Sequence, residues 1–226
     1  MPAPSLGTIL DRIGQIQAPL PAMAAILLGV AVLAAVVLPS WLVVQHVNTI
    51  AHEGAHALVG SSTGWKIDGI RLERNGNGET KRSSADSFGD VMTSAAGYVG
   101  PSAFGFGAAK LISVGHIIAV LWLALLLLAI MLAMIRNPFG FCSVVITGLM
   151  IYFVARYAAV GTQTVAAYVI TWFLLLSGLR VVLDHNVDAE DAKNLAGKTH
   201  LPRMLWVGMW LAGTAAALLA GGSLLV

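Results

Sequence analysis

The chain alternates long apolar runs with short polar segments. A helix that crosses a bilayer needs about 20 mostly apolar residues. Runs of this kind occur at residues 22–38, 41–60, 91–113, 115–135, 140–157, 163–183 and 203–225. Because lipid offers the backbone no hydrogen-bond partners, we expect each run to be helical. The pattern predicts an all-α polytopic membrane protein with about six to seven transmembrane helices.

Composition supports a single membrane-embedded domain spanning residues 1–226. Hydrophobic residues make up 58% of the chain and charged residues 11%, whereas soluble domains are about half apolar and a quarter charged. The mean hydropathy is +0.82. Cys142 is the single cysteine, which excludes a disulfide-stabilised secreted domain. The net charge of +2 is spread without a basic patch, so we expect no nucleic-acid partner.

The basic residues are divided unequally between the two sides that seven spans would define. Four segments then share one side: residues 1–21, 61–90, the turn at Arg136 and residues 184–202. That side holds all but two of the 13 lysines and arginines, the exceptions being Lys110 and Arg156. By the positive-inside rule this side is the cytoplasm, and the carboxyl terminus lies outside. The amphipathic residues 1–21 predict a short interfacial segment and not a signal peptide.

Residues 61–90 form the longest polar segment. They contain Asn75-Gly76-Asn77-Gly78, and Asn-Gly pairs tolerate the positive backbone dihedrals of tight hairpin turns. We therefore predict a membrane-associated cytoplasmic β-hairpin with strands at residues 65–72 and 79–84. A flexible solvated loop is the alternative, because the apolar residues of the first strand alternate imperfectly and the second strand has none.

The run at residues 41–60 contains His52-Glu53-Gly54-Ala55-His56, an HExxH pattern. Two histidines four residues apart lie on one face of a helix, so their ring nitrogens can bind one metal ion. Zinc suits imidazole ligands and keeps a position open for water when three protein ligands bind it, which lowers the pKa of that water to about 7. Glu53 would then act as general base and later as proton donor.

The location of this pattern favours a functional site. Ionisable side chains within an apolar span are costly in lipid and mark sites that face the interior of the bundle. The alternative is a pair of structural histidines hydrogen-bonded within the bundle. Asn48 lies one turn before His52, where it can orient the imidazole or bond a neighbouring helix. We expect no ligand among the other histidines, which are His46, His116, His185 and His200.

A third protein ligand is needed, and the sequence offers several carboxylates. Near the end of the sixth run are Asp184, Asp188 and Asp191, and in the hairpin region are Asp68, Asp86 and Asp90. The aspartates of the hairpin region can instead cap strands or helices. Asp191 can also cap a short helix at residues 192–196. Spacing alone does not choose among these carboxylates.

Three further segments accompany the HExxH pattern. Ala96-Gly97-Tyr98-Val99-Gly100-Pro101 opens the next span, and residues 180–184 (RVVLD) end the sixth. Residues 191–202 read DAKNLAGKTHLP, which is similar to a DAxxLAxxTxLP segment. Together these segments resemble the site-2 protease family of intramembrane zinc metallopeptidases, and in particular its small bacterial branch without a PDZ domain. The resemblance covers most of residues 41–210.

The resemblance implies a Zn²⁺ site with His52 and His56 as ligands, Glu53 as catalytic acid/base and an aspartate as third ligand. In larger family members this aspartate belongs to an LDG motif, but Leu183-Asp184 is followed here by His185. We expect Asp191 as the ligand, with Asp184 as the alternative.

The same resemblance implies a role in substrate positioning for Gly100 and Pro101, although the family's following asparagine has no counterpart here. It also implies a bacterial cytoplasmic (inner) membrane location. Because the histidines lie nearer the end of their span that the basic residues assign to the cytoplasm, we expect the active site to open to that side.

The predicted function is hydrolysis of a peptide bond of a membrane-spanning protein substrate. The substrate helix must unwind, after which an extended strand can pair with the edge of the hairpin. Gly97, Gly100, Gly105 and Gly107 are expected to let their span pack closely against the catalytic helix, although ordinary tight packing without a gating role explains them equally. The alternatives are a catalytically silent relative that binds a membrane partner, and a metal or proton transporter, although the chain lacks the internal repeats of transporters.

Overall fold

The computed structural model describes residues 6–82, 87–184 and 190–226. Its elements are α1 (Leu6–Gly14), α2 (Ala22–Val37), α3 (Trp41–Ser62), β1 (Ile67–Leu72), β2 (Gly78–Arg82), α4 (Ser87–Ser113), α5 (Ile117–Met134), α6 (Pro138–Tyr157), α7 (Val160–Asp184), α8 (Glu190–Thr199) and α9 (Arg203–Leu225). The predicted all-α membrane fold with a small β-hairpin is confirmed. Several predicted features lie outside the described residues: positions 1–5 of the interfacial segment, positions 83 and 84 of the second strand, Asp86, His185 and Asp188.

Within the described ranges, four helices are each long and apolar enough to cross a membrane, namely α5, α6, α7 and α9. α4 is not among them, because its glycine, serine and threonine residues lower its hydropathy. α2 and α3 meet the condition only together, with a bend of 101° between them. Pro39 explains the bend, because it cannot continue a helix and favours extended backbone at Leu38, where α2 has ended.

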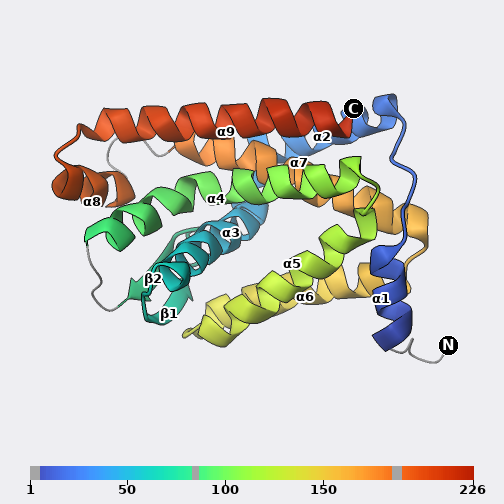
Figure 1. Cartoon of the computed structure of the whole chain (residues 1–226), viewed down its shortest axis with the longest axis horizontal. Helices are drawn as coiled ribbons and strands as arrows, with labels where there is room; N and C mark the ends of the chain where they lie inside the picture. Colours follow the sequence, from blue (N-terminus) through green and yellow to red (C-terminus); the bar gives the residue numbers. More distant parts are fainter. Residues whose placement is uncertain (1–5, 83–86, 185–189) are drawn as a thin grey trace.

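The contacts of the amino-terminal segment indicate that α2 and α3 form one broken crossing. Gln17 donates its backbone N–H to the carbonyl of Gly115 at 2.8 Å, and its side-chain oxygen accepts from the N–H of Ile118 at 3.0 Å. These partners lie where α5 begins, whereas the hairpin lies where α5 ends, with Ile70 paired to Ile135 (Figure 1). The expectation of two separate spans at residues 22–38 and 41–60 was therefore wrong. The expectation that the amino-terminal segment lies on the same side as the hairpin was wrong as well.

α4 lies at the centre of the bundle and packs against α3, α7 and α9 (Figure 1). Its glycines make different contacts. A Cβ on Gly97 or on Gly100 would overlap side chains of α3, so these two glycines permit close approach to that helix. A Cβ on Gly105 would instead meet α7, and one on Gly107 would meet nothing within 4 Å. The prediction that all four glycines pack against α3 is correct for the first two and wrong for the others.

The hairpin packs against the bundle through its first strand. β1 and β2 pair antiparallel, with Ile70 opposite Thr80 and Leu72 opposite Gly78. Ile70 and Leu72 are 0% and 1% exposed, which excludes the alternative of a flexible solvated loop. Gly76 has a φ of +92° in the turn. This positive dihedral is the conformation that the Asn-Gly pair predicted for a tight hairpin turn.

The connection between α5 and α6 occupies the outer edge of β1. The Asn137 side chain accepts a hydrogen bond from the Leu72 N–H at 3.1 Å and donates one to the Leu72 carbonyl at 2.7 Å. The Arg136 N–H donates to the Ile70 carbonyl at 2.9 Å. In the described part of the chain, β2 is therefore the strand at the open edge of the two-stranded sheet.

We predict that Asn137→Ala loosens the hairpin. The substitution removes both bonds to Leu72. Leaving the N–H and carbonyl of Leu72 without these partners lowers the local stability of the hairpin by about 1–3 kcal/mol. Amide hydrogen exchange across residues 67–72 should accelerate about tenfold, while exchange in α7 stays unchanged. Asn194→Ala, which removes an exposed asparagine of α8, is the matched control. Hairpin exchange at the wild-type rate in Asn137→Ala would contradict this anchoring role.

Candidate metal centre

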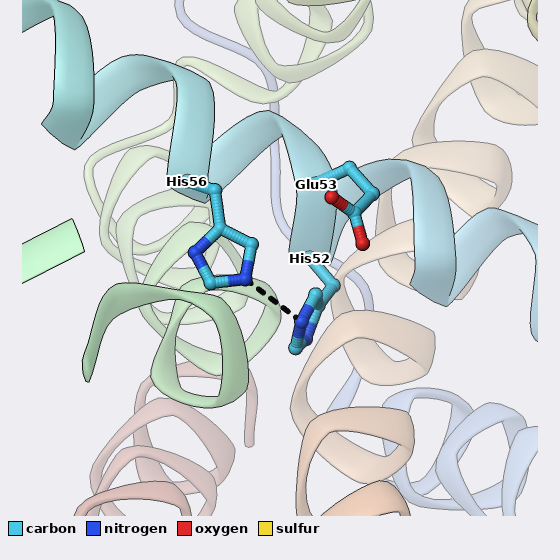
Figure 2. A group of neighbouring side chains, drawn as sticks. All are labelled: His52, Glu53 and His56. Atoms are coloured by element: carbon cyan, nitrogen blue, oxygen red, sulfur yellow. Dashed lines mark hydrogen bonds between the residues drawn. The ribbon is translucent and has the colours of Figure 1, made fainter. Parts of the chain in front are cut away.

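α3 brings three ionisable side chains together on its buried side (Figure 2). The Nε2 atoms of His52 and His56 are 3.1 Å apart. The ligand-capable atoms of the two histidines and Glu53 all lie within 4.8 Å of one another. His56 is 6% and Glu53 3% exposed. The residues that the HExxH spacing predicts to converge do converge, and this group can hold a metal ion.

α4 fixes the tautomer of His56. The Nδ1 atom of His56 lies 2.7 Å from the carbonyl oxygen of Thr93. Because a carbonyl oxygen only accepts, Nδ1 carries a proton and donates it, so Nε2, which faces His52, is the ring nitrogen of His56 that can bind a metal ion. A histidine held through its other nitrogen by a backbone carbonyl is the usual arrangement at metal sites.

α8 brings a carboxylate to the two imidazoles. The Oδ2 atom of Asp191 lies 3.5 Å from His52 Nε2 and 3.2 Å from His56 Nε2. Burial raises the pKa of the Asp191 carboxyl, but hydrogen bonds from the two imidazoles and their charge lower it by more, so the pKa lies below its usual range. The Asp191 carboxylate therefore faces both imidazoles at hydrogen-bonding or ligand distance.

α8 is fixed against the bundle by apolar residues and an ion pair. Ala192 and Leu195 are both 0% exposed and pack in an apolar cluster with two tryptophans of α9. Near the end of the helix, Lys198 forms an ion pair with Asp90 of α4. These contacts hold the first turn of α8, and with it Asp191, over the histidines.

The three facing atoms have the spacing of metal ligands. A tetrahedral zinc ion with bonds of about 2.0 Å separates its ligand atoms by roughly 3.3 Å. The triangle formed by the two histidine Nε2 atoms and Asp191 Oδ2 has edges of 3.1, 3.2 and 3.5 Å. Two imidazoles and one carboxylate are also a donor set of hydrolytic zinc sites that keep a fourth position open. The residues present therefore fit a Zn²⁺ ion.

Gly97 and Tyr98 of α4 form a wall beside the imidazoles. A Cβ on Gly97 would overlap His56 Nε2 and lie 2.7 Å from His52 Cε1. The Tyr98 ring meets the His52 ring edge-on, with centroids 4.9 Å apart, and stacks on Trp210 at 4.4 Å. The imidazoles are thus confined from the side of α4, where position 97 has no room for a side chain.

Glu53 faces the hairpin. The Thr80 hydroxyl donates a hydrogen bond to Glu53 Oε2 at 2.5 Å. A Cβ on Gly78 would lie 2.6 Å from Glu53 Oε1. The carboxylate of Glu53 is therefore held by β2, whereas that of Asp191 faces the imidazoles.

A cavity of about 970 Å³ lies between the hairpin, α3 and α8. The three residues of the triangle line it together with Glu53 and Asn48. Asn48 is 3% exposed, and its Oδ1 has no hydrogen-bond partner among the described residues. Asn48 Oδ1 therefore bonds neither the imidazole of His52 nor a neighbouring helix, the two partners that the sequence suggested. The role of Asn48 in orienting His52 stays a prediction.

Other predicted residues lie apart from the triangle. The Asp184 carboxylate accepts a hydrogen bond from Arg180 Nε at 2.9 Å, is 45% exposed, and forms no ion pair with either histidine of α3. Gly100 packs against α3, and Pro101 is buried within α4. Neither of these two is among the described residues that line the cavity, so their part in substrate positioning stays a prediction.

Sequence reasoning left three contributors unassigned, namely Thr80, Thr93 and Tyr98. Thr93 acts through its backbone carbonyl, which no side-chain pattern reveals. Thr80 alternates with Gly78 on one face of β2, a period of two that the sequence contains. Tyr98 stands within the segment that carries the family resemblance, but its contact with His52 depends on how closely α4 approaches α3.

We predict that Gly97→Ala weakens zinc binding about 10- to 100-fold, the range found when residues that orient metal ligands are changed. The added methyl group overlaps His56 Nε2 and displaces the imidazole. Gly107→Ala adds the same methyl group to α4 in open space and should bind zinc as the wild type does. Competition with a chromophoric chelator measures both affinities, and equal affinities would rule out the tight fit at position 97.

The sequence matches the family model described as Peptidase M50B-like over residues 23–221. Searches of curated proteins and of solved structures found no match. The matched region includes α3, the hairpin, α4 and α8, which contribute all the residues of the centre. The predicted resemblance to the site-2 protease family is thereby confirmed, and the chain belongs to the Peptidase M50B-like family.

Proposed function

We propose that the protein is an intramembrane zinc metalloprotease that hydrolyses a peptide bond of a membrane-spanning protein substrate. The proposal rests on the triangle of two imidazole nitrogens and the Asp191 carboxylate, with the Glu53 carboxylate beside it. Membership of a peptidase family and the multi-pass apolar helices support it. His52, His56 and Asp191 hold the Zn²⁺ ion, and Glu53 is the general acid/base.

Asp191 is preferred to Glu53 as the third ligand because the two carboxylates have different partners. Residues 52 and 53 are about 100° apart around a helix of 3.6 residues per turn, so adjacent side chains diverge. Glu53 Oε2 accepts a short hydrogen bond from Thr80. Asp191 Oδ2 instead faces both imidazole nitrogens. This division leaves Glu53 available for proton transfer.

The chemistry then divides between the ion and the protein. Bound zinc supplies a Lewis acid that polarises the scissile carbonyl and lowers the pKa of a water molecule. Glu53 accepts a proton from this water as the water oxygen bonds to the carbonyl carbon. Glu53 then delivers the proton to the amide nitrogen, the C–N bond breaks, and a carboxyl and an amine product leave.

The substrate is proposed to bind in extended form. Helical carbonyls are hydrogen-bonded within their own helix, so the substrate segment must unwind before attack. Residues 78–81 of β2 line the cavity, and β2 is the open edge of the sheet. Its backbone can therefore pair with an extended strand.

The substrate is drawn from the lipid bilayer that surrounds the bundle. The hairpin end carries most of the basic residues, since Arg12 joins only Lys110 and Arg156 at the other end. We propose that the hairpin end faces the cytoplasm at a bacterial inner membrane, with the active site open to that side.

We predict that Asp191→Ala loses bound zinc, while Asp184→Ala keeps it. Removing one of three protein ligands should lower zinc affinity at least 100-fold. Asp184 is the matched control, because its carboxylate pairs with Arg180 and not with the histidines. Metal analysis of the two purified variants beside wild type decides the point. Zinc retained in Asp191→Ala and lost in Asp184→Ala would reverse the assignment.

We predict that Glu53→Gln abolishes peptide cleavage and keeps zinc. The amide cannot accept the proton, so the rate should fall by a factor of about 100 or more. The assay follows a set of synthetic single-span peptides by mass spectrometry, with the purified protein in proteoliposomes. Asp11→Asn changes an exposed carboxylate of α1 that does not line the cavity, and this variant should cleave at the wild-type rate. Equal cleavage by wild type and Glu53→Gln would remove the protease proposal.

A further inference from the structure

β2 confines both oxygens of the Glu53 carboxylate. Gly78 and Thr80 are two residues apart in the strand and therefore lie on one face, which here faces α3. The Thr80 hydroxyl donates to Glu53 Oε2 at 2.5 Å and lies 3.5 Å from the Glu53 backbone oxygen. A Cβ on Gly78 would lie 2.6 Å from both Cγ and Oε1 of Glu53. Oε2 of Glu53 is thus hydrogen-bonded to Thr80, and Oε1 lies close to the backbone of Gly78.

The bond from Thr80 determines the orientation of the carboxylate. Glutamate has several rotatable bonds, so a defined orientation needs a partner that selects one rotamer. Within the described ranges, no other hydrogen bond to the Glu53 carboxylate is present. Glu53 is 3% exposed, and a hydrogen bond to a carboxylate is stronger at such a buried place than in water.

The strand that carries Thr80 is itself held on both sides. Thr80 pairs across the sheet with Ile70, whose carbonyl accepts a bond from the backbone of Arg136. At the turn, the Thr49 hydroxyl of α3 donates to the Gly76 carbonyl at 2.6 Å. The hydroxyl of Thr80 is therefore presented by a framed hairpin, and its position relative to α3 is defined by contacts independent of Glu53.

We propose that Thr80 is a positioning residue, whose hydroxyl holds the Glu53 carboxylate in the orientation required for proton transfer. The inference rests on the proposed function, in which Glu53 is the general acid/base. It assigns the hairpin a second task in addition to offering an edge to the substrate. The strand that binds the substrate backbone also orients the base that acts on it.

The test compares Thr80→Val, which keeps the shape of the side chain and removes the hydroxyl, with Thr80→Ser, which keeps the hydroxyl. Thr147→Val is the matched control, because it removes a hydroxyl that bonds to its own helix in α6. With the single-span peptides as substrates, Thr80→Val should lower kcat about tenfold at unchanged KM and unchanged zinc content. Thr80→Ser should restore kcat, and Thr147→Val should match wild type.

A spectroscopic measurement on the protein alone complements the kinetics. In protein labelled with ¹³C-glutamate, the infrared difference between wild type and Glu53→Gln isolates the Glu53 carboxyl band. Loss of the hydrogen bond should shift this band in Thr80→Val and leave it in place in Thr80→Ser. Gly78→Ala serves as a second variant, because its methyl group pushes on the same carboxylate while Thr80 stays intact.

The outcomes separate the two proposals. If wild type cleaves the peptides faster than Glu53→Gln and Thr80→Val matches wild type in kcat, the positioning role is overturned while the protease proposal stands. A Glu53 band that is identical in wild type, Thr80→Val and Gly78→Ala overturns it as well. A loss confined to KM points to substrate binding and equally rejects positioning. If wild type and Glu53→Gln are equal, the proposed function itself has failed.

Discussion

The close approach of α4 to α3 is the contact on which the centre depends. At Gly97 a Cβ would overlap His56, so the absence of a side chain there lets the Thr93 carbonyl reach that imidazole. The same approach brings the Tyr98 ring against His52. α4 thus provides the space for the His56 ring at Gly97, the hydrogen bond that holds this ring, and the aromatic ring that contacts His52. The small and polar residues that make this possible also lower the hydropathy of α4, which lies at the centre of the bundle.

Each segment that completes the centre is fixed by apolar packing of its own, away from the chemistry. α8 places Asp191 at the imidazoles because Ala192 and Leu195 of the same helix are buried in an apolar cluster. The hairpin brings Thr80 to Glu53 because Ile70 and Leu72 are buried beneath β1. Buried polar groups gain little from one another unless their geometry is defined. Here the surrounding apolar contacts define that geometry.

The sequence was informative wherever the signal is local. The HExxH spacing predicted the convergence of His52 and His56, and the Asn-Gly turn predicted the hairpin. Tertiary relationships were less accessible. Asp191 lies far along the chain from the histidines, and spacing could not distinguish it from Asp184. The sequence shows Pro39 between two apolar runs, but whether the second run crosses the membrane separately depends on packing. Counting the two runs as separate spans also placed the amino-terminal segment on the wrong side.

The two kinds of group on α3 are supported by different parts of the protein. The histidines are confined by α4 and face α8, which are joined to each other and to α9 by an ion pair and an apolar cluster. Glu53 is held from the hairpin. An extended segment paired with β2 would therefore lie beside the strand that holds the carboxylate, whereas the contacts of the imidazoles come from other elements. The general base and the proposed metal ligands thus depend on separate sets of contacts.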